Sequence, residues 1–131
     1  MILVDSSVWI DYFNGRNTVK TDWLDSAIGK KHIFVGDLIL AEILQGFQSD
    51  TDFITAKNLL LNFPFVEMVG QDLALKSALN YRFLRKNGVT VRKTIDVMIG
   101  TFCIHYKCSL LHDDRDFNPM EKYLHLKTIT V

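Results

Sequence analysis

The sequence is poor in the residues that mark secreted, zinc-binding or membrane proteins. Only Cys103 and Cys108 are cysteines, and we expect both to be reduced thiols of a cytoplasmic protein. Together with His105 and His112 they lack the paired spacing of zinc ligands, so we expect no zinc site. No apolar run approaches the ~18 residues of a membrane span, and the first residues lack the basic leader of a signal peptide. We therefore expect a cytoplasmic protein with no membrane partner.

The sequence also lacks an excess of charge of either sign. Lys plus Arg and Asp plus Glu both total 15, so the formal net charge is zero. This argues against binding of nucleic acid through overall charge, although it leaves room for local clusters. Five basic residues do gather on both sides of Gly88, and they are Arg82, Arg85, Lys86, Arg92 and Lys93.

The apolar residues that are present alternate between strand-like and helix-like patterns. With 131 residues, 48% of them hydrophobic, the chain is expected to form a single domain over residues 1–131. The alternation predicts an α/β fold with a central, mostly parallel β-sheet flanked by helices on both faces. The expected strands are 2–4, 32–35, 65–69, 109–111 and 124–131. The expected helices are 8–13, 18–28, 38–47, 50–61, 70–86 and 95–106.

The first strand, Ile2-Leu3-Val4, ends at an acid. Asp5 lies where this strand passes into the first helix, for which Ser6 or Ser7 is the expected N-cap. In open α/β sheets, ligands bind just beyond the carboxyl ends of the strands. Asp5 is therefore expected to be part of the functional site.

Four further acids stand where a carboxylate is costly to place. Glu42 lies in an apolar helix, Asp96 in the first turn of another, and Asp114 and Asp116 directly follow the strand 109–111. Neighbouring buried carboxylates repel one another unless a cation neutralises them. Ligands that offer only oxygen favour Mg²⁺ or Mn²⁺ over Zn²⁺. The set therefore predicts a hard-cation site.

Each acid taken alone has a simpler explanation. Asp96 complements the dipole of its helix, Glu42 can pair with a lysine, and Asp114 and Asp116 are ordinary turn residues. These separate explanations do not predict that all the acids lie near one crevice, whereas the metal site does.

Four segments of the sequence together resemble the PIN-domain ribonucleases, and among these the VapC-type toxins of bacterial or archaeal toxin–antitoxin pairs. The segments are Val4–Ile10, Ala41–Ile43, Thr94–Gly100 and Leu111–Phe117. They occur in order over the whole chain. The resemblance implies a metal-dependent endoribonuclease that hydrolyses phosphodiester bonds in RNA with Mg²⁺ or Mn²⁺, and it leaves the number of metal ions open.

The resemblance also implies roles for individual residues. The catalytic metal ligands would be Asp5, Glu42, Asp96 and Asp114, with Asp116 as an accessory acid that acts through water. Ser7 matches a small hydroxyl residue that orients Asp5 or a water. One departure is His112, since the family often has Thr or Ser two positions before Asp114. We interpret it as the exchange of one polar group for another, with substrate contact as the alternative.

The implied partners are an RNA substrate, a cognate VapB-type antitoxin and a second copy of the chain in a homodimer. Arg92 and Lys93 are expected to contact RNA phosphates, whereas we interpret the other basic residues near Gly88 as a solvated helix end. A group of phenylalanines would line a groove for the antitoxin or the dimer, or else belong to the core: Phe47, Phe53, Phe63 and Phe65.

Two other functions remain open at this point. One is a PIN nuclease for RNA processing that has no antitoxin. The other is a non-catalytic PIN-like protein-binding module, against which the full set of costly acids argues, because such a module has no use for them.

Overall fold

The computed structural model describes residues 1–131 and has a four-stranded parallel sheet at its centre. The strands are β1 (Ile2–Val4), β2 (Ile33–Gly36), β3 (Phe65–Val66) and β4 (Ser109–Leu111), in the order β3-β2-β1-β4. Leu3 and Val4 point to opposite faces of the sheet, and both are 0% exposed. Both faces of the central strand are therefore covered, as a parallel sheet requires, and the predicted α/β fold is confirmed.

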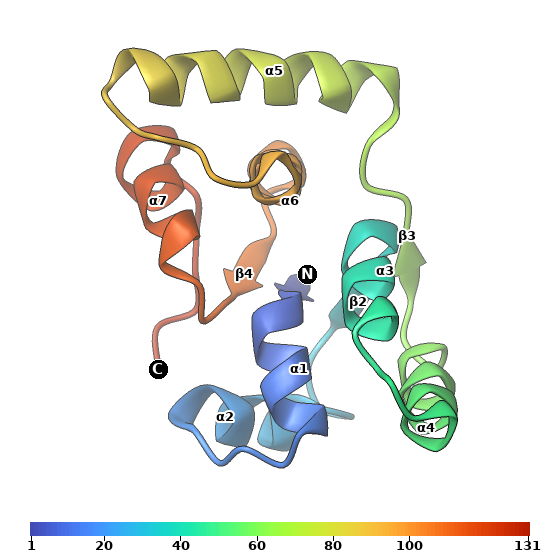
Figure 1. Ribbon diagram of the computed structural model, residues 1–131. Helices are drawn as coiled ribbons and strands as arrows, with labels where there is room; N and C mark the ends of the chain where they lie inside the picture. Colours follow the sequence, from blue (N-terminus) through green and yellow to red (C-terminus); the bar gives the residue numbers. More distant parts are fainter.

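Seven α-helices and one 3₁₀ turn surround the sheet (Figure 1). In Figure 1, α5 crosses one end of the molecule beside α6, and α1 and α2 lie at the other end. The helix bounds are α1 (Ser6–Phe13), α2 (Val19–Ala27), α3 (Asp37–Gln45), α4 (Asp50–Leu60), α5 (Gly70–Lys86), α6 (Thr94–Tyr106) and α7 (Asn118–Leu124), with η1 at Arg115–Phe117. No helix is long and apolar enough to cross a membrane.

The end of the chain differs from the prediction. A strand over residues 124–131 is wrong, because only Thr128 forms a single parallel bridge, to Leu110 of the edge strand β4. Leu124 instead ends the short helix α7, which the sequence patterns did not reveal. A helix of seven residues spans barely two turns and has too few positions to set a helical period.

Two helix starts also differ from the prediction. Asp5 itself, rather than Ser6 or Ser7, caps α1, and its side chain accepts from the Ser7 backbone N–H. The helix expected to begin at residue 95 starts one residue earlier, at Thr94. The stop after α5 is as expected, since Gly88 follows the helix in the left-handed region at φ +81°.

The four phenylalanines divide between core and surface. Phe63 and Phe13 pack on the buried Trp9 with ring centroids 5.5 and 5.7 Å away, and Phe47 packs on Phe13 at 6.0 Å. Phe65 is 54% exposed. The aromatic cluster around Trp9 thus explains Phe47 and Phe63 as packing residues, and only Phe65 is clearly open to solvent.

Candidate metal centre

The parallel register brings the carboxyl ends of β1 and β4 together. Val4 pairs with Leu111, and the Asp5 N–H donates to the Leu111 carbonyl over 2.9 Å. The next turn of the chain is tied down as well, because the Asp113 N–H donates to Ser7 Oγ over 3.1 Å. The residues after β4 are thereby held beside Asp5, as the sequence predicted.

Asp5 is 2% exposed and lies against Ser7. Its Oδ2 accepts from the Ser7 N–H over 3.0 Å and from Ser7 Oγ over 2.6 Å. Its Oδ1 is buried without any partner. Burial raises the pKa of Asp5, and the two Ser7 hydrogen bonds offset this only in part. Ser7 thus fixes the orientation of Asp5 and leaves one oxygen free for a ligand.

Glu42 reaches the site from α3. Its Oε1 accepts a hydrogen bond from Ser6 Oγ over 3.2 Å. Burial first, and then the nearby Asp5 carboxylate, raise the pKa of Glu42. Sequence reasoning considered Ser6 only as a helix cap and missed this contact, which joins residues 36 positions apart.

Asp96, Asp114 and Asp116 form the tightest group of acids, with potential ligand atoms within 4.8 Å of one another. Asp96 is 4% exposed, and burial raises its pKa to about 6 despite the nearby Lys93 ammonium. The pKa of Asp114 is shifted in the opposite direction. Burial alone would raise the pKa of Asp114, but the Asp116 N–H, 2.9 Å from its Oδ1, and Lys93 hold it below the usual value.

Lys93 and Arg92 lie inside this acidic group rather than beside it. Lys93 Nζ lies 3.1 Å from Asp114 Oδ2 and 3.4 Å from Asp96 Oδ2, the second contact being an ion pair without hydrogen-bond geometry. Burial would lower the pKa of Lys93, yet the hydrogen bond to Asp114 and both acids raise it to about 12. Arg92 Nε lies 3.3 Å from Asp116 Oδ2. The two cations thus offset part of the negative charge.

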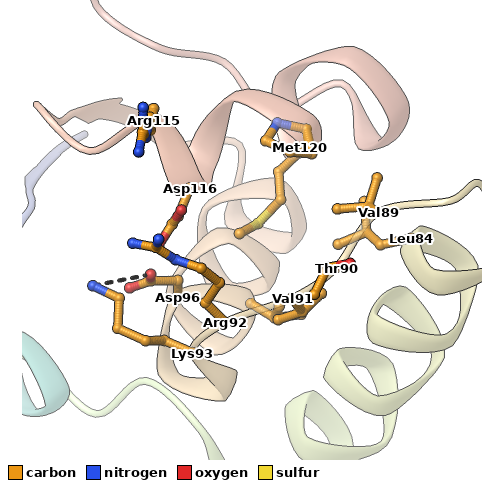
Figure 2. Close-up of a pocket in the computed structure, with 12 residues that line it drawn as sticks. Leu84, Val89, Thr90, Val91, Arg92, Lys93, Asp96, Arg115, Asp116 and Met120 are labelled. Atoms are coloured by element: carbon orange, nitrogen blue, oxygen red, sulfur yellow. Dashed lines mark hydrogen bonds and ion pairs between the residues drawn. The ribbon is translucent and has the colours of Figure 1, made fainter.

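A cleft opens beside these residues (Figure 2). It encloses about 380 Å³ of space, part of it open to solvent. Figure 2 shows Asp96, Asp116, Arg92 and Lys93 gathered on one side of it, and Val89, Val91, Leu84 and Met120 on the other. The remaining predicted basic residues, Arg82, Arg85 and Lys86, are exposed on α5 and do not line the cleft.

The residues present fit a divalent cation. The donor set consists of carboxylate oxygens without thiol or imidazole, which suits a hard ion. Two buried oxygens, Asp5 Oδ1 and Asp96 Oδ2, have no hydrogen-bond partner, and a buried carboxylate oxygen left unpaired is costly. A cation beside these carboxylates would satisfy the two oxygens and offset both the burial and the neighbouring charges that raise the pKa values of Asp5, Glu42 and Asp96.

Comparison with known proteins gives a consistent result. The sequence model of the PIN domain matches residues 2–123. Ribonuclease VapC11 of Mycobacterium tuberculosis (strain H37Rv) is 27% identical over 130 residues, covering 97% of this chain and 96% of the relative. The VapBC2 structure of Rickettsia felis, bound to a promoter DNA fragment, aligns with TM-score 0.78 at 13% identity over 98% of both chains. VapC20 of M. tuberculosis, a sarcin–ricin-loop-cleaving toxin, aligns with TM-score 0.68 at 14% identity over 90% of this chain and 93% of that one.

Proposed function

The chain belongs to the PIN domain family, and we propose that it is a metal-dependent endoribonuclease acting as the toxin of a VapBC-type toxin–antitoxin pair. One observation carries this proposal. The acids Asp5, Glu42, Asp96 and Asp114 come from four separate segments, and the pKa values of the first three are raised by burial and, in addition, by the nearby Asp114 carboxylate. The ribonuclease relatives and the toxin–antitoxin complexes of the same fold support the assignment.

Mg²⁺ or Mn²⁺ is the proposed cofactor, held by Asp5, Glu42, Asp96 and Asp114 with Asp116 as an accessory acid. When bound, such an ion supplies charge stabilisation at the scissile phosphate and lowers the pKa of an attacking water. The protein's own contribution is orientation. Ser7 holds Asp5 by two hydrogen bonds, and the Asp116 N–H holds Asp114. These fixed carboxylates keep the site organised before substrate arrives.

Arg92 and Lys93 are proposed to bind RNA phosphates at the mouth of the cleft. Both line the cleft, and each is held there by an acid of the site. A polyanion approaching five carboxylates needs such local positive charge, because the net charge of the whole chain is zero. The substrate class is RNA in single-stranded or looped form, whose phosphates are open to such contacts.

We further propose that residues 1–131 act as one PIN domain that forms a homodimer and is held by a VapB-type antitoxin. A PIN nuclease without an antitoxin would share the site but would cause no growth arrest on expression. A non-catalytic binding module would gain nothing from the buried acids Asp5 and Asp96, whose exposures are 2% and 4%. Burying them without a cation costs stability, which disfavours that alternative.

Cleavage of total RNA by the purified protein tests the proposal. Wild type and Asp96→Asn are incubated with RNA in Mg²⁺, Mn²⁺ or EDTA, and the new ends are mapped by sequencing. We expect wild type to produce discrete ends only when the metal is present. Asp96→Asn should cleave at these positions at least 100-fold more slowly. Glu67→Gln, which changes an exposed acid outside the site, should cleave like wild type. Equal cleavage by Asp96→Asn, or cleavage that survives EDTA, would refute the metal mechanism.

A further inference from the structure

His112 is a buried histidine directly after β4, two residues before Asp114, and it is 8% exposed. A histidine in such a place invites assignment as a metal ligand or a general base. Its contacts argue against both roles. Nδ1 accepts the Asp114 backbone N–H over 3.2 Å, so its lone pair is already engaged. Nε2 lies 4.0 Å from Glu121 Oε2 on α7.

His112 lines a different cavity from the cleft beside Asp96 and Asp116. His112 lines a hollow of about 450 Å³ together with Lys20, Glu121, Thr128 and Thr130. The cleft at the acidic group is lined by Asp96 and Asp116 and does not include His112. Asp5, Glu42 and Asp114 do not line that cleft either, so the case for a positioning role rests on the contacts of the imidazole itself.

The contacts around His112 all fix the turn that carries Asp114. The His112 carbonyl accepts from Lys20 Nζ of α2 over 2.6 Å. The imidazole packs on Phe117 with ring centroids 4.9 Å apart. The next residue, Asp113, is tied to Ser7. Lys20 and Ser7 thus hold the backbone of the turn, while the ring packs on Phe117 and presents Nδ1 to the Asp114 backbone N–H.

We propose that His112 is a positioning residue whose Nδ1 holds the Asp114 backbone so that the Asp114 carboxylate lies within the ligand group of Asp96 and Asp116. The inference rests on the proposed function, since it assigns Asp114 to the metal centre. Side chains of Ser, Thr, Asn and Asp commonly accept the N–H two residues later in a turn. His112 performs the same task in a neutral ring whose proton is on Nε2.

Substitutions at position 112 separate the effect of losing the Nδ1 hydrogen-bond acceptor from the effect of losing the packing of the side chain. Asparagine places Oδ1 the same number of bonds from the backbone as Nδ1, so His112→Asn keeps the acceptor. Leucine has nearly the shape of asparagine but accepts no hydrogen bond, so His112→Leu is its matched control. His112→Phe keeps a ring against Phe117 and also lacks the acceptor, and it replaces the leucine variant if that one does not fold.

The first readout needs neither metal nor RNA. Hydrogen exchange of the Asp114 amide, followed by NMR in EDTA, should be slow in wild type and His112→Asn. It should be at least 10-fold faster in His112→Leu or His112→Phe, with the melting temperatures of all folded variants compared as a control. Unchanged exchange at Asp114 in the variants without an acceptor would overturn the proposal.

The second readout is the affinity for Mn²⁺, measured by calorimetry without RNA. Loss of a residue that orients a metal ligand commonly weakens binding 10- to 100-fold. We expect that loss in His112→Leu, and less than a 3-fold change in His112→Asn. Equal weakening in both would assign His112 a packing role only and would overturn the proposal. If wild type cleaves no RNA while the exchange and Mn²⁺ patterns hold, the proposed function fails and the positioning role stands.

Discussion

At the scale of single residues, the site is defined by carboxylates whose charges are only partly matched. Asp5 Oδ1 and Asp96 Oδ2 are buried without a hydrogen bond, and Lys93 is the one cation shared by Asp96 and Asp114. Burial, together with the nearby Asp5 and Asp114 carboxylates, raises the pKa of Asp96 to about 6 despite the Lys93 ammonium. Binding a divalent cation would reverse this preference by stabilising the ionised carboxylates.

The raised pKa of Asp96 predicts how the stability of the metal-free protein depends on pH. The pKa is about 6 in the folded state and near its ordinary 3.8 when unfolded. Between these values the folded state binds more protons, so the free energy of unfolding should decrease from pH 4 to pH 6, by about 1–2 kcal/mol from this group. Asp114, with its lowered pKa, contributes in the opposite direction.

Urea denaturation in EDTA at several pH values isolates the contribution of Asp96. The difference in unfolding free energy between Asp96→Asn and wild type should grow in favour of the variant as the pH rises through this window. Glu67→Gln serves as the control and should stay parallel to wild type. A difference that does not change with pH would show that Asp96 is not desolvated as described.

The acids themselves were predictable from sequence because each stands in an apolar context or at a strand end. The groups that contact these acids could not be predicted from the sequence. Asp5 caps α1 and Lys93 inserts between Asp96 and Asp114 through contacts made only when distant segments meet. The bond from Lys20 to the His112 carbonyl joins residues 92 positions apart, and no local pattern indicates it.

At the scale of elements, the site depends on how closely the helices approach the strand ends. Gly36 ends β2 directly before α3, the helix that carries Glu42. A Cβ on Gly36 would lie 2.1 Å from Sδ and 2.7 Å from Cγ of Met68, a side chain that is 0% exposed. The absence of a side chain at Gly36 therefore lets β2 and α3 pack against Met68.

Gly36→Ala should therefore destabilise the protein by about 1–3 kcal/mol, because the buried Met68 must be displaced in a packed core. Gly46→Ala is the matched control at the other end of α3, where the nearest atom to a new Cβ is 3.6 Å away and the backbone is right-handed helical. It should change stability by less than about 0.5 kcal/mol. Chemical denaturation measures both, and equal effects would contradict this account of the packing.

The internal elements could be predicted because apolar runs and glycine stops set their limits independently of the rest of the chain. The C-terminal elements could not. Alternating residues after Leu124 resemble a strand, but the segment pairs with β4 only at Leu110, through the Lys127 carbonyl and the Ile129 N–H. Whether such a pattern pairs depends on how the end of the chain packs against the rest of the molecule, which local alternation does not show.

At the scale of the whole molecule, segments that are far apart in the sequence come together at one edge of the sheet. Parallel strands place their carboxyl ends together, which brings Asp5 after β1 and Asp114 after β4 to one edge, whereas Glu42 and Asp96 are supplied by the helices α3 and α6. The parallel topology and the convergence of these acids follow from the alternation of strands and helices. The cleft walls and the cations within the site depend on side-chain packing and require the structure.

Thermal unfolding with increasing Mn²⁺ tests most directly the central claim that these acids form a divalent-cation site. A cation that binds only the folded state should raise the melting temperature of wild type by about 10 °C at a hundredfold excess over its dissociation constant. Asp5→Asn keeps an acceptor for Ser7 but loses the charge, and it should show little of this increase, whereas Glu67→Gln should respond like wild type. No increase in wild type, or an equal increase in Asp5→Asn, would contradict the claim.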